Sequence, residues 1–128
     1  MGLVHVRASI GAAPNDLREM RFLVDTGSFY SAIPPSIRNL LVLIPGIPTE
    51  VMLADGRIVD AELTLAVLKI DGREAGIPVE ISEVPEPLLG VSALEALGMK
   101  VNPTTQQLEE ATPFSRPPRM TRFRIFPK

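Results

Sequence analysis

The sequence of 128 residues contains no cysteine, no tryptophan and a single histidine, His5. Without cysteine there is no disulfide, no thiolate metal site and no cysteine nucleophile. One histidine is too few for a zinc site. A Ser-His-Asp triad would have to use His5, which lies in a predicted strand and is expected to be a structural or surface residue. Carboxylates are therefore the catalytic groups that this chain can supply.

Long apolar runs are also missing. The longest, residues 40–44, ends at Pro45 and is far shorter than the run of about 18 residues that a membrane span needs. The N-terminus lacks the charged start and long apolar centre of a signal peptide. We therefore expect a cytoplasmic protein with no membrane span. Hydrophobic residues make up 45% and aromatic residues only 5%, which predicts one domain with an aliphatic core.

Acidic residues are absent from the end of the chain. Residues 1–110 carry a net charge of −7, whereas residues 111–128 carry +5 and four prolines. This predicts an acidic domain over 1–110 and a basic, Pro-rich tail over 111–128. The tail is either a disordered arm or an added edge strand or dimer arm. The second alternative is suggested by residues 120–126, in which apolar and basic residues alternate. The tail can attract an acidic partner, but nothing indicates specific nucleic-acid binding.

Short β-prone runs separated by turn residues dominate the domain, which predicts an all-β fold. We expect strands over residues 3–10, 20–24, 32–33, 50–53, 57–59, 63–70, 77–81, 99–103 and 106–109. One helical turn is expected from Pro35. Near the C-terminus the apolar period changes, and Ser92 as N-cap with Gly98 as stop predicts one short helix.

The most informative motif is Asp25-Thr26-Gly27-Ser28, which directly succeeds the apolar run 22–24. Desolvation penalises a charged carboxylate at the end of a buried strand, so a protein that keeps one there usually uses it or pairs it. The same residue types also form ordinary strand-end turns. Motifs further along the chain add weight to the catalytic interpretation.

Two such motifs are present. Asp55-Gly56 separates two β-prone runs and is a strong signal for a β-hairpin. Leu88-Leu89-Gly90 leads directly into the predicted helix. In chain order, residues 22–28, 33–34, 53–57, 88–91 and 94–103 resemble the retropepsin-like aspartic proteases, in particular the stand-alone prokaryotic ones related in fold to retroviral proteases. The resemblance covers about residues 3–110.

The resemblance implies a retropepsin-like acid protease barrel protomer whose active site lies at a homodimer interface. Each chain would supply one catalytic Asp25, and the pair would share a proton, one carboxylate acting as general base on water. Thr26 would lock the two active-site loops together, Gly27 would leave room for substrate, and Ser28 would donate a hydrogen bond to the outer oxygen of Asp25. No metal or cofactor is implied, and the substrate would be a peptide or an unfolded protein.

The resemblance also assigns a flap and a supporting segment. Leu53, Ala54, Asp55, Gly56 and Arg57 would form a mobile hairpin over bound peptide, although a plain surface hairpin fits the same residues. Ile33, Leu89 and Gly90 would support the catalytic loop, with Gly90 where the strand passes close behind it. Apolar residues of the flap region could line specificity pockets, which favours apolar substrates; they are Ile47, Val51, Leu53 and Ile58.

Other functions remain open on the sequence alone. The strongest alternative is a catalytically silent dimer of the same fold that binds peptide or acts as a scaffold. A hydrolase acting through Ser28 is disfavoured because the chain lacks a suitable base.

Overall fold

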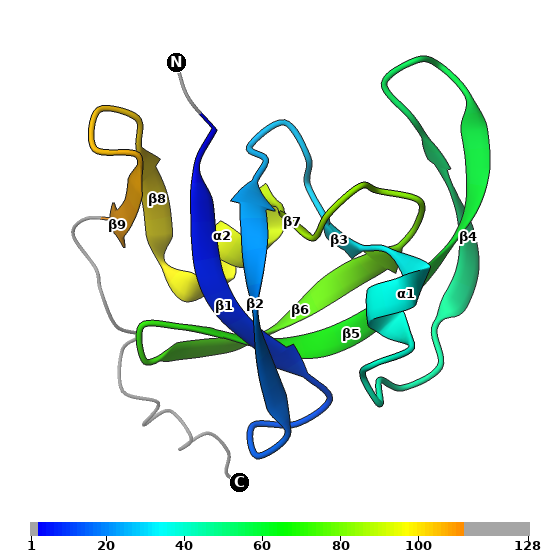
Figure 1. Cartoon of the computed structure of the whole chain (residues 1–128), viewed down its shortest axis with the longest axis horizontal. Helices are drawn as coiled ribbons and strands as arrows, with labels where there is room; N and C mark the ends of the chain where they lie inside the picture. Colours follow the sequence, from blue (N-terminus) through cyan, green and yellow to red (C-terminus); the bar gives the residue numbers. More distant parts are fainter. Residues whose placement is uncertain (1–2, 112–128) are drawn as a thin grey trace, which may run out of the picture.

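The computed structural model describes residues 3–111, and β-strands account for most of its regular structure (Figure 1). The strands are β1 (His5–Gly11), β2 (Leu17–Val24), β3 (Ser31–Ile33), β4 (Ile47–Met52), β5 (Ile58–Ile70), β6 (Arg73–Ile81), β7 (Leu88–Leu89), β8 (Met99–Asn102) and β9 (Gln107–Glu110). The helices are α1 (Pro35–Arg38) and α2 (Val91–Leu97). The expected β class, with a short helix near the C-terminus, is therefore confirmed.

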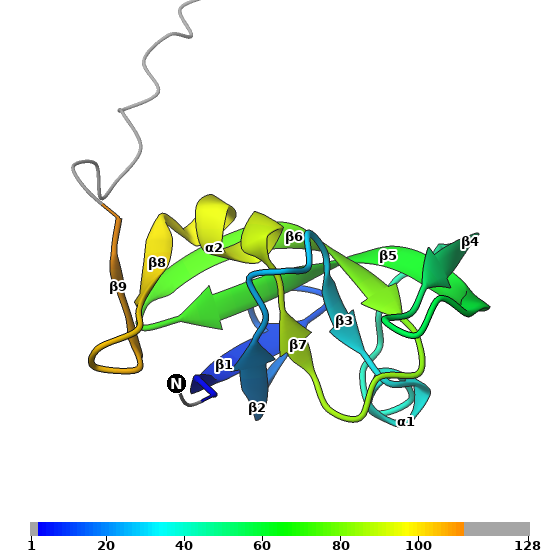
Figure 2. The ribbon, with the colours of Figure 1, turned by 90° about the horizontal axis from the view of Figure 1, so that it is seen from above.

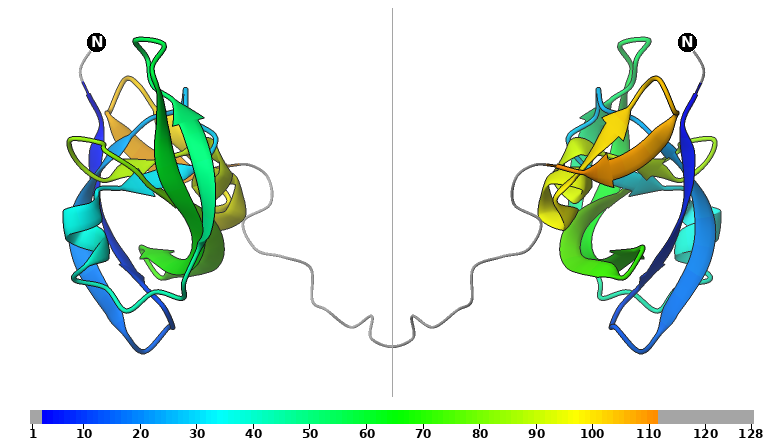
Figure 3. Two further views of the ribbon diagram at one scale, coloured as in Figure 1. Left: turned by 90° about the vertical axis from the view of Figure 1, so that its right-hand side faces the viewer. Right: turned by 90° about the vertical axis from the view of Figure 1, so that its left-hand side faces the viewer.

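The strands close into a barrel. The sheet order is β1-β2-β7-β3-β6-β5-β4, and β1 also pairs with β5, which joins the two ends of a six-strand ring. β4 stays outside this ring and pairs only with the first part of β5. The β4–β5 hairpin consequently projects from the barrel as a two-stranded ribbon, which Figure 3 shows from the side.

A single aliphatic cluster fills the interior, as the composition predicts. Its most deeply buried large side chains include Phe22, Ile10, Leu68 and Leu89, each with no exposed surface. Burial of such side chains is the main favourable contribution to folding. α2 packs on β6 and β3 and adds three buried residues to the same cluster (Figure 2).

The turn between β5 and β6 sets the register of the longest hairpin. Asp71 and Gly72 have φ of 49° and 80°, so both central residues are left-handed, as a type I′ turn requires. The sequence prediction of a turn here is confirmed. The predicted break between strands 57–59 and 63–70 is wrong, because β5 runs without interruption and exchanges its partner from β4 to β6 near Glu62.

The helix near the C-terminus begins two residues earlier than its predicted N-cap, Ser92, implies. Gly90, with extended backbone, is the N-cap, and Ser92 lies inside the first turn. The Ser92 hydroxyl donates instead to the carbonyl of Phe29, at 2.6 Å. Gly98 ends the helix in a left-handed conformation, φ 67°, as expected.

An ion pair holds the base of the β4–β5 ribbon. Arg38 donates to Glu62 at 3.1 Å, and the backbone N–H of Gly46 donates to the same carboxylate at 2.7 Å. The hydrogen bond from Arg38, with that from Gly46, holds the pKa of Glu62 below its ordinary value. The stabilisation is therefore present above the carboxyl's unfolded pKa and is lost as the pH falls through its folded pKa.

Glu62→Gln is expected to lower the free energy of unfolding by about 1 kcal/mol at neutral pH, since both partners are partly exposed. Urea unfolding at neutral and at acidic pH measures this difference. The gap between variant and wild type should close at acidic pH, where wild-type Glu62 is protonated as well. A gap that is independent of pH would contradict the role of the charge.

The remaining predictions concern a membrane span and the basic tail. Within residues 3–111 no helix has the length and apolar character to span a membrane. The predicted order or disorder of the basic tail, including residues 120–126, concerns positions that fall outside the described residues.

Candidate active site

Asp25 stands where β2 leaves the barrel. β2 runs parallel to β7, with Leu23 opposite Leu88 and Val24 opposite Leu89. The backbone N–H of Asp25 donates to the carbonyl of Leu89 at 2.9 Å. This hydrogen bond continues the pairing of β2 with β7 and fixes the backbone position of Asp25. The two predicted segments around Asp25 and Leu89 are thus brought side by side, although 64 positions separate them in the sequence.

The loop after Asp25 is tied to the start of α2. The N–H of Val91 donates to the carbonyl of Ser28 at 2.8 Å. The N–H and the hydroxyl of Ser92 both donate to the carbonyl of Phe29. These bonds satisfy backbone groups at the N-terminus of the helix and hold the loop against it.

Gly90 lies where these two segments are closest. A Cβ built on this residue would fall 2.6 Å from the carbonyl carbon of Tyr30, which is backbone and has no room to move. The N–H of Gly90 donates to the hydroxyl of fully buried Ser31 at 3.0 Å. The expected supporting role of Gly90 thus has a physical basis, namely a close backbone approach. Ser31 is a second support that the sequence analysis did not identify.

The other two supporting residues lie in the core. Ile33 and Leu89 have no exposed surface, and the carbonyl of Ile33 accepts a hydrogen bond from Ser82. β3 pairs with β7 and with β6, so it joins the strand behind Asp25 to the strand that carries Glu80. Both residues therefore position neighbouring strands from behind the site.

Asp25 as a residue is half-buried, and its loop is open to solvent at Thr26 and Gly27. Oδ1 accepts a hydrogen bond from the N–H of Gly27 at 3.1 Å, and the N–H of Ser28 donates to the Asp25 carbonyl. The expected bond from the Ser28 hydroxyl to the Asp25 carboxylate is not among the hydrogen bonds of residues 3–111. The backbone turn supplies the stabilising donor in its place.

A cavity of about 320 Å³ joins Asp25 to the β4–β5 ribbon. Its walls come from the Asp25 loop, the ribbon and the segment after β6; they include Asp25, Ser28, Ala32, Val51, Met52, Leu53, Ala54, Glu80, Ser82, Glu83, Val84, Pro85 and Leu88. A second cavity of about 340 Å³ adjoins it and shares Ser28, Val51, Met52 and Glu80. The two neighbouring cavities are together called the cleft, which is bounded by the Asp25 loop on one side and by the ribbon on the other.

The tip of the ribbon is built as the sequence predicts. Leu53 and Arg57 close it through a backbone bond of 2.8 Å, and Gly56 takes φ of 89°. The Asp55 carboxylate accepts bonds from the N–H and the guanidinium of Arg57, which hold the pKa of Asp55 below its ordinary value. The charged pair thus stabilises the turn at the tip.

Only part of the predicted flap lines the cleft. Leu53 and Ala54 face Asp25 across the cavity, whereas the other three predicted flap residues are exposed at the tip and are absent from its walls. Of the predicted pocket residues, Val51 also lines the cleft. The prediction for Ile47 is wrong, because this residue lies at the far end of β4 and lines a separate apolar cavity. Ile58 is absent from the walls of the cleft, and 61% of its surface is exposed.

Glu80 is one of the cleft residues that the sequence analysis missed, and it lines both cavities. It sits on β6 opposite Ala32 of β3. Burial raises the pKa of its carboxyl above the ordinary value. The alternation of β6 carried a signal, since Glu80 lies between the apolar residues Val79 and Ile81.

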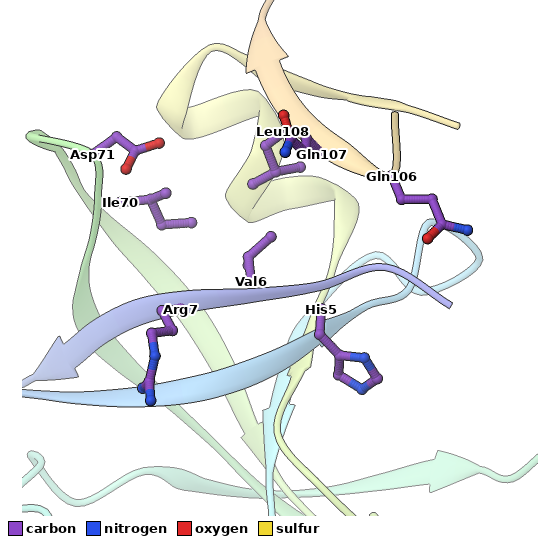
Figure 4. Close-up of a pocket in the computed structure, with 8 residues that line it drawn as sticks. All are labelled: His5, Val6, Arg7, Ile70, Asp71, Gln106, Gln107 and Leu108. Carbon is purple, nitrogen blue, oxygen red and sulfur yellow. The ribbon is translucent and has the colours of Figure 1, made fainter. Parts of the chain in front are cut away.

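His5 lies outside the cleft. It lines a different cavity of about 290 Å³, to which none of residues 25–28 contributes, and its Nε2 lies 3.0 Å from Glu86. In Figure 4, Val6 points from β1 toward Leu108, while His5 and Arg7 point to the other side of the strand. This contact fits the structural alternative of the expectation that His5 is a structural or surface residue.

Neither a scan against protein-family models nor a search of curated proteins finds a match for this chain. The cleft is therefore the basis for a functional proposal. Its titratable side chains include three carboxyls that line one cavity, those of Asp25, Glu80 and Glu83.

Proposed function

We propose that this chain is one protomer of a retropepsin-like aspartic endopeptidase that works as a homodimer. The observation that carries the proposal is the cleft itself. Asp25 and the projecting β-ribbon line the same cavity, which has a volume of about 320 Å³. In this proposal the ribbon is the flap. It closes over a peptide whose scissile bond lies against Asp25.

A second chain is needed because one carboxylate is half of the catalytic group. In the dimer two Asp25 side chains meet and share one proton, since like charges at contact distance do not both ionise readily. The surface around Asp25 supports such an interface: Thr26 and Gly27 are exposed, and Phe29 leaves 59% of its surface in solvent. An exposed aromatic next to an open loop favours burial against a partner.

The reaction needs only these carboxyls and water. The ionised Asp25 takes a proton from water, and the water oxygen attacks the carbonyl carbon of the peptide bond. The protonated Asp25 gives its proton to the carbonyl oxygen. The carbon–nitrogen bond then breaks as the nitrogen takes the proton that the dyad holds, while a hydroxyl of the tetrahedral diol returns its proton to the other Asp25, which regenerates the shared-proton state.

Cleavage of an unfolded protein tests this proposal. Wild-type protein is incubated with unfolded casein between about pH 3 and pH 7, a range that spans the titration of a carboxyl dyad. We expect cleavage with an optimum in this range, and inhibition by pepstatin, a transition-state mimic of aspartic proteases. A folded dimer that binds peptide but cuts nothing at any pH would favour the silent binding module.

A further inference from the structure

We propose that Glu80 forms a subsite for a cationic side chain, so that the cleft selects peptides with lysine or arginine near the scissile bond. This inference rests on the proposed function, because it takes the cleft to be a peptide site. It specifies which peptides the cleft would bind, which the Asp25 motif alone does not indicate.

The position of Glu80 carries the argument. Along β6, Ile77, Val79 and Ile81 are buried in the core, and Glu80 points to the opposite face because successive strand residues alternate. On that face its cross-strand neighbours are Ala32 and Leu63, neither of which is charged. The carboxylate therefore enters the cleft from a rigid central strand, where its place is fixed by pairing on both sides.

Glu80 also has no cationic partner among the residues that the structure describes. Within residues 3–111 it takes part in no ion pair, and neither of the two cavities that it lines includes a lysine or an arginine. Glu62, on the adjacent strand, is the useful contrast, because Arg38 neutralises it. A desolvated carboxylate without a partner is unfavourable, and a ligand cation is what would compensate it.

The rest of the cleft suits the stem of such a side chain. Val51 and Met52 of the ribbon line both cavities with Glu80, so an aliphatic stem would contact them while its charged end reaches the carboxylate. Arginine would bind through two parallel hydrogen bonds and lysine through a point charge. No lysine, arginine or histidine lines the cleft, so no cationic side chain there opposes a ligand cation. Its other titratable side chains are the phenol of Tyr30 and the carboxyls of Asp25, Glu50 and Glu83.

The pKa of Glu80 gives the subsite a pH signature. Burial raises this pKa in the free protein, and a bound cation would lower it again, so binding of a basic peptide releases a proton. The preference for lysine over an uncharged isostere should therefore grow as the pH rises through the titration of Glu80. Because the cleft holds three further carboxyls, those of Asp25, Glu50 and Glu83, the test compares two peptides on one protein rather than one peptide at two pH values.

Peptide binding to the Asp25→Asn variant tests the subsite without relying on cleavage. Fluorescent octapeptides carry either lysine or norleucine at each position in turn, and anisotropy gives their affinities. At one position or more we expect lysine to bind about 10- to 100-fold more tightly than norleucine, the usual range for a charged hydrogen bond. Adding Glu80→Gln should remove the preference, whereas the matched change Glu74→Gln, at an exposed position of the same strand, should leave it.

The outcomes separate the subsite from the protease. Equal affinity for lysine and norleucine at every position, or a preference that survives Glu80→Gln or does not grow with pH, would overturn the subsite. Failure of all the peptides to bind would overturn it as well. A lysine preference that depends on Glu80, in a protein whose wild type cleaves none of these peptides, would support the subsite and contradict the protease.

Discussion

Asp25→Asn is expected to lower the rate of peptide cleavage by at least about 100-fold and up to about 10,000-fold, the range for loss of a general acid–base group. An amide cannot accept a proton from water, so neither half of the dyad can act. The dimer should persist and become more stable at neutral pH, because the two carboxyls no longer repel each other. Casein cleavage and the dissociation constant of the dimer measure the two effects.

Asp71→Asn is the matched control for this variant. Asp71 lies in the β5–β6 turn at φ 49°, a conformation that asparagine tolerates, and it is not part of the cleft. Its cleavage rate should equal that of wild type. A dimer weakened by Asp25→Asn, or substantial cleavage by that variant, would count against a carboxyl dyad.

Gly90→Ala has the second large effect. The new methyl group would overlap the backbone of Phe29 and Tyr30, which is held by α2 on one side and by Ser31 on the other. Overpacking of this kind costs about 1–3 kcal/mol or more, and here the displaced segment is the loop that carries Asp25. We expect a lower midpoint of urea unfolding together with loss of cleavage in the fraction that stays folded.

Gly76→Ala provides the comparison for this change. Gly76 lies in β6 without a positive φ, and an added Cβ meets nothing within 4 Å. Its unfolding free energy should stay within about 0.5 kcal/mol of wild type. If both glycine variants unfold at the wild-type midpoint, the close approach behind the Asp25 loop has no energetic importance.

Local signals in the sequence were enough for the hairpin turns and for the C-terminal end of α2. Asp71-Gly72 and Gly98 adopt the positive φ that their residue types favour, and Asp55-Gly56 lies at the tip of a hairpin. Such turns depend on neighbouring residues only, so they can be recognised without knowledge of the fold. The register of the strands that they join is then set by the turn.

The arrangement around Asp25 was harder to predict because its contacts are distant in sequence. Glu80 enters the cleft only because β3 pairs with β6, and Ser31 meets Gly90 only because β3 also pairs with β7. Nothing local to Ser31 or Glu80 indicates these partners. By contrast, the bond from the Gly27 N–H to the Asp25 carboxylate is local, and within residues 3–111 it takes the place of the expected bond from the Ser28 hydroxyl.

A mixing experiment tests most directly whether two chains make one active site. Wild-type protein at constant concentration is mixed with increasing amounts of Asp25→Asn protein, allowed to exchange subunits, and assayed for peptide cleavage. A mixed dimer holds a single Asp25 and is inactive, so the activity should fall toward zero as the variant comes into excess, with Asp71→Asn protein causing no such loss. Activity that stays constant although mixed dimers form would show that each chain works alone and would contradict the shared dyad.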